Sequence, residues 1–216
     1  GHSRTYADIG EMIDTLSENL LKKGLSPGDR VMIFCGNSVE YIAAYFAALK
    51  TGAVAVPVNP QKTAGSISYI AGKCVPGFIV TKAPEIDVLS KLDLPCSASV
   101  VDIGGLDFGG ITDFRGNIAV EPDEDDNAVI LFTSGTTAHP KGVTLSHRNL
   151  LENTRAILDY LKISPDDSVL MTLPFSYSYG NSVLLTHAAA GASLVIDPSS
   201  AYPYQILEDI KNSGVT

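Results

Sequence analysis

The chain has 216 residues, of which 45% are hydrophobic, and this is enough apolar material for one large or two small packed domains. Its formal net charge of -9 argues against a surface built to bind nucleic acid or an anionic membrane, because its long-range field would repel phosphate. An anionic ligand would therefore need a local binding loop.

The ends and the cysteines indicate a cytoplasmic protein without a membrane span. The three cysteines, Cys35, Cys74 and Cys96, are far apart and show no close pair of the kind that marks zinc or redox sites. This pattern is typical of buried free thiols in a reducing compartment. Charged residues interrupt the first thirty positions, and the longest apolar run, 41–49, is far shorter than the roughly 20 residues that a bilayer requires. Residues 1–3 are interpreted as a cloning remnant.

Helical and strand patterns alternate along the rest of the chain. Thr5 and Asp8 predict a capping box at the start of a helix that Gly24 ends, and a second helix is expected from about 38 to 50. Strands are expected at 30–35, 53–58, 78–81, 99–102, 129–132, 169–173 and 193–196. Strands this apolar, joined by helices, predict an α/β fold of layered parallel sheets with flanking helices.

The region 104–127 is rich in glycine and then acidic, and it is interpreted as a surface connection. The acidic cluster, Glu121 with residues 123–126, has two interpretations: a metal site or a solvated loop. The solvated loop is favoured, because charge runs usually mark exposed segments.

The segment 131–143, Leu-Phe-Thr-Ser-Gly-Thr-Thr-Ala-His-Pro-Lys-Gly-Val, carries most of the chemical information. Hydroxyls, glycines and a lysine directly after an apolar strand suit a polyphosphate, because backbone N–H groups in such a turn form an anion nest. A P-loop is disfavoured, since Pro140 and Gly142 flank the lysine and a strand pattern follows where a P-loop has a helix. A hairpin is expected instead, and an ordinary polar hairpin remains the alternative.

This segment resembles the phosphate-binding signature of the adenylate-forming superfamily, which includes acyl-CoA synthetases, luciferases and nonribosomal adenylation domains. The resemblance extends over most of the chain, through 5–8, 27–31, 36–38, 49–54, 57–60 and 145–150. One position departs from the pattern: Ala138 stands where the family normally has glycine, so that a backbone conformation suited to glycine would be strained there.

The resemblance implies an ATP-dependent, AMP-forming acid–thiol ligase that makes an acyl-adenylate, releases pyrophosphate and passes the acyl group to coenzyme A or phosphopantetheine. It implies that hydroxyls and a lysine bind the β- and γ-phosphates, that two glycines permit the turn, and that Mg²⁺ accompanies ATP. The residues concerned are Thr133, Ser134, Gly135, Thr136, Thr137, Lys141 and Gly142.

A second segment, 173–180, resembles the family's acid-pocket wall, where a strand leads into a helix through glycine. Tyr177 and Gly180 are assigned to this pocket by resemblance, and the alternative is a tyrosine that only packs at a strand end. His147 is predicted to begin a helix after Ser146 in a structural role.

The resemblance places residues 4–216 in the N-terminal domain of such an enzyme, with the adenine and ribose contacts, the catalytic lysine and the C-terminal domain beyond them. The chain alone is therefore expected to be inactive, with no catalytic residue of its own. Two alternatives stay open: a naturally short nucleotide-binding or regulatory protein of the same fold, and an amino-acid adenylation domain that loads a carrier protein. The acid and the oligomeric state are not indicated.

Overall fold

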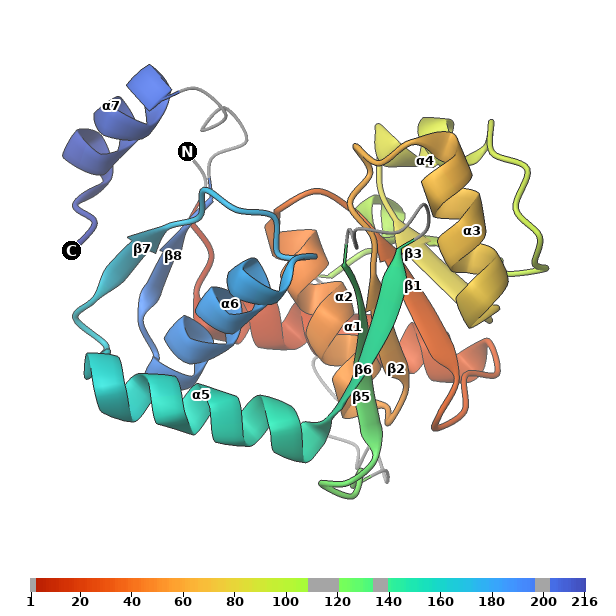
Figure 1. Cartoon of the computed structure of the whole chain (residues 1–216), viewed down its shortest axis with the longest axis horizontal. Coiled ribbons are helices and arrows are strands. Elements are labelled where there is room, and N and C mark those ends of the chain that lie inside the picture. The colour runs from red at the N-terminus through yellow and green to blue at the C-terminus, as the bar shows by residue number, and fades with distance from the viewer. Residues whose placement is uncertain (1–2, 109–120, 134–139, 197–202) are drawn as a thin grey trace. The chain divides into compact units, whose positions relative to one another are not determined.

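The structure is a computed structural model that describes residues 3–108, 121–133, 140–196 and 203–216 (Figure 1). The chain divides into two compact units, Gly1–His147 and Arg148–Thr216. Each unit is described by itself.

Unit 1 is built on a six-stranded sheet whose strand order is β4-β3-β1-β2-β5-β6. The strands are β1 Arg30–Phe34, β2 Val54–Pro57, β3 Phe78–Thr81, β4 Ser99–Asp102, β5 Asn127–Thr133 and β6 Lys141–Ser146. The first five pair in parallel and β6 pairs antiparallel with β5. β1 to β3 are buried on both faces, apart from half-buried Arg30 at the start of β1, which confirms the predicted parallel α/β sheet.

Two helices, α1 Tyr6–Lys22 and α2 Val39–Lys50, pack against each other on one face of this sheet. The predicted capping box is present, because Thr5 and Asp8 exchange hydrogen bonds between side chain and backbone at the start of α1. Ser38 caps α2 in the same way, by accepting from the N–H of Tyr41. Both helices therefore begin where their capping residues predict.

The other face of the sheet is covered by α3 Ala64–Cys74 and the short α4 Glu85–Leu89 (Figure 1). Met32 and Phe34 of β1 point to this side together, as alternate residues of a strand must. They pack against Ile67 and Ile70 of α3. A 3₁₀ turn, η1 Ile103–Gly105, follows β4.

Unit 2 contains a two-stranded parallel sheet with helices beside it. Its elements are α5, which begins at His147 and ends at Leu161, β7 Ser168–Leu170, α6 Ser178–Ala190, β8 Ser193–Val195 and α7 Pro203–Ser213. The strand expected at 169–173 ends three residues early, because its partner β8 is only three residues long and Pro174 has no N–H to donate. The N–H of Thr216 donates to the carbonyl of Ser168 at the start of β7.

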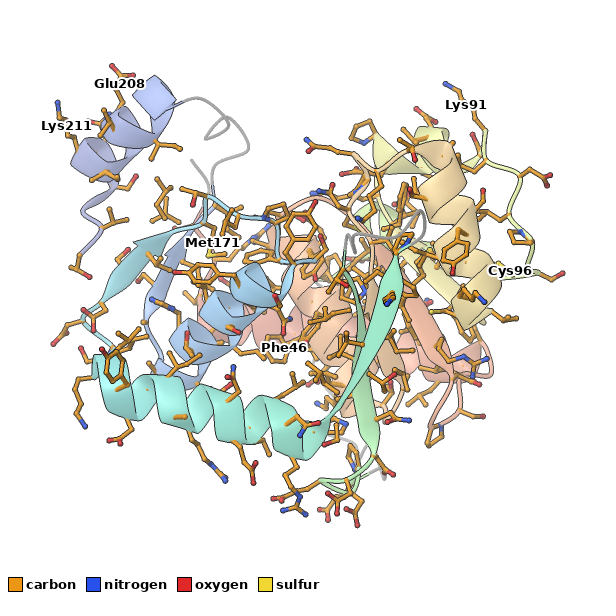
Figure 2. The ribbon with its side chains drawn as sticks, in the orientation of Figure 1. Phe46, Lys91, Cys96, Met171, Glu208 and Lys211 are labelled. Carbon is orange, nitrogen blue, oxygen red and sulfur yellow. The ribbon has the colours of Figure 1, made fainter. Side chains whose placement is uncertain are left out.

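Three further expectations have outcomes in the structure. All three cysteines are free thiols; Cys35 and Cys74 are buried, and Cys96 lies half-buried in the loop before β4 (Figure 2). Half of the connection predicted at 104–127, residues 109–120, falls outside the described residues, while 121 and 123–126 are exposed. Among the described helices, none has the length and apolar composition to cross a membrane.

Candidate functional site

The expected hairpin is formed by β5 and β6, and its open end holds the described residues of the segment that is predicted to bind phosphate. Thr133 pairs with Lys141, and Phe132 pairs with Gly142. The hydroxyl of Thr133 donates to the carbonyl of Lys141 across the hairpin at 3.4 Å. Because β5 runs parallel to β2, this pair lies at the carboxyl edge of the sheet, where open α/β folds place ligands.

Gly142 lies within β6, so its predicted role in permitting the turn needs a different physical reason. A Cβ there would sit 3.1 Å from both Ile130 Cγ2 and Phe132 Cζ on β5. Because Gly142 has no side chain, the side chains of Ile130 and Phe132 can lie over its backbone. A larger residue at this position would have to displace these two side chains by a few tenths of an ångström.

Lys141 supplies the positive charge at this edge. Its side chain is exposed, and among the residues that the structure describes it makes no ion pair. Its ammonium is therefore available to an anion held by the loop. Ser134, Gly135, Thr136, Thr137 and Ala138 lie outside the described residues, so their assignment stays a prediction.

Tyr177 and Gly180 lie together at the start of α6 in unit 2. Tyr177 is the N-cap residue of α6 and its side chain is 41% exposed, so it is not buried in a core. Gly180 is buried against the carbonyl of Pro174, and a Cβ at this position would lie 2.2 Å from that oxygen. The glycine thus lets the chain turn tightly from β7 into α6, and Tyr177 stands on that turn.

Sequence reasoning missed a buried hydroxyl in the same turn. Ser176 is 6% exposed, and its Oγ has no hydrogen-bond partner among the described residues. An unpartnered buried hydroxyl is uncommon, because burial without a hydrogen bond costs free energy. A serine beside an aromatic residue carries no sequence signal that separates it from any other turn serine.

A second polar cluster was also missed, at the carboxyl ends of β1 and β3. The N–H of Gly36 donates to Glu85 Oε1 at 3.1 Å, and Lys82 Nζ contacts Glu40 Oε2 at 2.7 Å. The chain leaves β1 and β3 toward opposite faces here, which makes this point the topological switch point of the sheet.

The acidic segment after residue 120 forms a turn. The carboxylates of Asp123 and Asp126 accept backbone N–H groups of Asp125 and Asp123 at 2.9 and 3.0 Å. Within the described ranges, no three His, Cys, Asp or Glu side chains are placed to hold a metal ion. These contacts assign the Asp123 and Asp126 carboxylates to the local turn.

His147 begins α5, as the sequence predicts, and its N–H donates to the carbonyl of Asp126 at 3.1 Å. Burial lowers the pKa of its imidazole from the usual 6.5, and the Asp126 carboxylate opposes that shift. Its Nε2 atom is buried and has no hydrogen-bond partner among the described residues. The folded chain therefore favours the neutral imidazole.

This shift predicts a pH dependence of stability. The unfolded chain takes up the imidazole proton first, so the contribution is complete above pH 6.5 and is lost as the pH falls through the lower folded-state pKa. We expect His147→Gln to reduce the loss of unfolding free energy between about pH 7.5 and pH 5. Urea denaturation of both proteins at the two pH values measures it, and an unchanged loss contradicts the prediction.

Comparison with known proteins identifies the family of the chain. The family described as AMP-binding enzyme matches residues 1–216, the whole chain. The chain belongs to the AMP-binding enzyme family. The α/β fold is that of an adenylate-forming enzyme's N-terminal domain.

Individual AMP-binding relatives agree with this family assignment. The long-chain-fatty-acid–CoA ligase FadD13 of Mycobacterium tuberculosis is 32% identical over 90% of this chain and 40% of its own length. A linear gramicidin synthase polypeptide of Brevibacillus parabrevis is 29% identical over 89% of this chain and 2% of its own length. The inhibitor-bound N-terminal domain of FACL13 from Mycobacterium tuberculosis superposes with a TM-score of 0.83 at 26% identity, covering 98% of this chain and 54% of that domain. The chain thus spans about two fifths of the FadD13 ligase.

Proposed function

We propose that this chain provides the triphosphate-binding hairpin and one wall of the acid pocket of an ATP-dependent carboxylic acid–thiol ligase. The observation that carries the proposal is the β5–β6 hairpin of an AMP-binding chain, whose open end holds the Thr133–Lys141 pair at the carboxyl edge of the sheet. The remaining contacts of the active site would come from the rest of an enzyme of the relatives' length, so activity is expected only in such a protein.

In the proposed reaction, a carboxylate oxygen of the acid attacks the α-phosphorus of ATP, and the bond from that phosphorus to the bridging oxygen breaks. Negative charge builds up on the leaving pyrophosphate, and fixed donors and a cation stabilise it best. We assign the Thr133 hydroxyl and Lys141 ammonium to this task, with the hydroxyls of Ser134, Thr136 and Thr137. A thiol then attacks the acyl carbon and AMP leaves.

The donor set fits a triphosphate but includes no evident metal ligand. Mg²⁺ would bind through the phosphate oxygens and water, as this ion usually keeps several waters and few protein ligands. The acceptor thiol is coenzyme A or a carrier-bound phosphopantetheine, since the relatives include a CoA ligase and a peptide synthase. We favour the CoA ligase, because it has the higher identity.

The test of the hairpin is Lys141→Ala in a protein that carries this chain within the full enzyme. Loss of one charge-assisted contact of about 1.5–3 kcal/mol predicts an adenylation rate roughly 10–100-fold lower. ATP–pyrophosphate exchange with a panel of carboxylic acids measures it. Lys91→Ala is the matched control, because this exposed lysine lies in the loop after α4 (Figure 2). Equal rates for the two variants would remove Lys141 from the phosphate site.

The length of the source reading frame separates the ligase from a naturally short binding protein. A frame that continues to the length of the relatives supports the ligase. A stop codon near Thr216 would favour the nucleotide-binding or regulatory alternative.

Tyr177 tests the acid pocket separately from the hairpin. Tyr177→Ala removes a large rigid surface, so we expect the ratio of kcat/KM between a bulky and a short acid to rise by roughly 10–200-fold. The KM for ATP should stay the same, because this side chain is assigned to the acid alone. Tyr179→Ala is the control, as this ring is two residues away and 68% exposed. A fall in thermal stability with an unchanged acid preference would make Tyr177 a packing residue.

A further inference from the structure

Unit 1 has a hollow of about 720 Å³ at the amino edge of its sheet, on the side of α1 and α2. It is lined by residues of both helices, by Glu121 and Pro122 before β5, and by His147 after β6. It is a wide, open depression whose volume is in the range of small-molecule sites, so a ligand in it would keep one side in solvent. Neither the hairpin nor the acid pocket uses any of these residues.

This hollow and the phosphate-binding hairpin lie at opposite edges of the sheet. His147 follows Ser146, which pairs with Asn127 at the first residue of β5, whereas Lys141 pairs with Thr133 at its last. Six residues of strand separate these ends by about 20 Å. A ligand in the hollow therefore cannot be the triphosphate held by the hairpin.

The walls of the hollow combine an apolar surface with an excess of negative charge. The apolar part consists of Ile13, Phe46, Leu49 and Pro122. Phe46, on α2, is labelled in Figure 2. Asp14 and Lys50 neutralise each other in an ion pair across the two helices. Glu121 then leaves one negative charge without a compensating cation in the lining.

The imidazole of His147 adds a polar atom, Nε2, to the lining. Its Nε2 atom is buried, and no described residue forms a hydrogen bond with it. A neutral imidazole with its proton on Nδ1 offers Nε2 as an acceptor. A turn of the imidazole toward the hollow that it lines would let this atom accept an N–H from a ligand, and a positively charged ligand would also neutralise Glu121.

We propose that the hollow binds a small organic cation, a primary ammonium group carried on a compact apolar body. The ammonium lies between Glu121 and Nε2 of His147, and the apolar body contacts Ile13, Leu49 and the ring of Phe46. The ring of Phe46 thus adds apolar contact area for the body of the ligand. The site is separate from catalysis and suits an effector that binds at a distance.

The test is an isothermal titration calorimetry experiment in which 2-phenylethylamine is added to the full chain. The control ligand is 2-phenylethanol, which has the same apolar body and no charge. We expect saturable one-to-one binding of the amine and binding of the alcohol that is at least about tenfold weaker. ATP should not displace the amine. Equal binding of amine and alcohol, or competition with ATP, would overturn the proposal.

Two glycines provide a blocking variant and a matched control. Gly10 lines the hollow within α1, and a Cβ there meets no atom within 4 Å, so Gly10→Leu places a side chain in the open space. Gly65 in α3 has equally open surroundings and lies away from the hollow. We expect Gly10→Leu to weaken amine binding by about tenfold or more and Gly65→Leu to leave it unchanged.

The charged wall is tested by Glu121→Gln against Glu124→Gln, two exposed carboxylates of the same segment, of which only the first lines the hollow. The first change should weaken amine binding about two- to fivefold and the second should not. Amine binding that survives both Gly10→Leu and Glu121→Gln would show that the amine binds elsewhere.

Discussion

Gly180→Ala is expected to destabilise unit 2 by at least about 3 kcal/mol, at the upper end of the cost of overpacking. The added Cβ would lie 2.2 Å from the carbonyl oxygen of Pro174 and 2.8 Å from its carbonyl carbon. Those are backbone atoms, so no side-chain rotation can relieve the clash. The carbonyl of Pro174 also accepts the N–H of Tyr177 at 3.0 Å, so any displacement breaks the turn that carries Tyr177.

Hydrogen exchange locates this effect within the chain. We expect the amides of α6 to lose protection in Gly180→Ala, while those of β1 to β3 keep theirs, because the clash lies wholly within unit 2. Ser178→Ala is the control, since this side chain is exposed two residues earlier in the same helix. Unchanged α6 protection in Gly180→Ala would mean that the turn adjusts without cost.

The fold could be predicted from the sequence wherever the signal is local. Thr5 and Ser38 mark helix starts because their hydroxyls accept backbone N–H groups three residues on, and this geometry needs no other part of the chain. The hairpin was predictable for the same reason, as the residues after Lys141 alternate like a strand. Strand ends such as that of β7 depend on the partner strand, which sequence periodicity does not contain.

The candidate site was only partly predictable. Resemblance identifies Lys141 and Tyr177 by position, but the space constraints on Gly142 and Gly180 come from atoms across a strand pair and across a turn. The unpartnered Nε2 of His147 likewise depends on burial by segments distant in the sequence. Sequence spacing therefore finds the groups that touch a ligand, and the structure is needed for the residues that hold them.

The second large expected effect is a loss of stability on substitution of Phe34 in the core between the sheet and α3. Phe34 is the last residue of β1, has no exposed surface, and belongs to the cluster between the sheet and α3. Phe34→Ala should cost about 3–5 kcal/mol, because the deleted ring leaves a cavity that a central strand cannot close. Phe132 of the hairpin is a member of the same cluster, so part of this loss falls on the strand that leads to Thr133.

Urea unfolding measures the loss, and Val100→Ala is its control, because this β4 side chain is 47% exposed on an edge strand and should cost less than about 1 kcal/mol. Exchange should then show the reverse of the Gly180→Ala pattern, with protection lost from β1 to β3 and kept in α6. In the full enzyme, Phe34→Ala should also weaken ATP binding more than Val100→Ala does, since a loosened β5 no longer fixes the Thr133–Lys141 pair. Equal ATP affinity in the two variants would show that the hairpin keeps its geometry independently of the core beneath it.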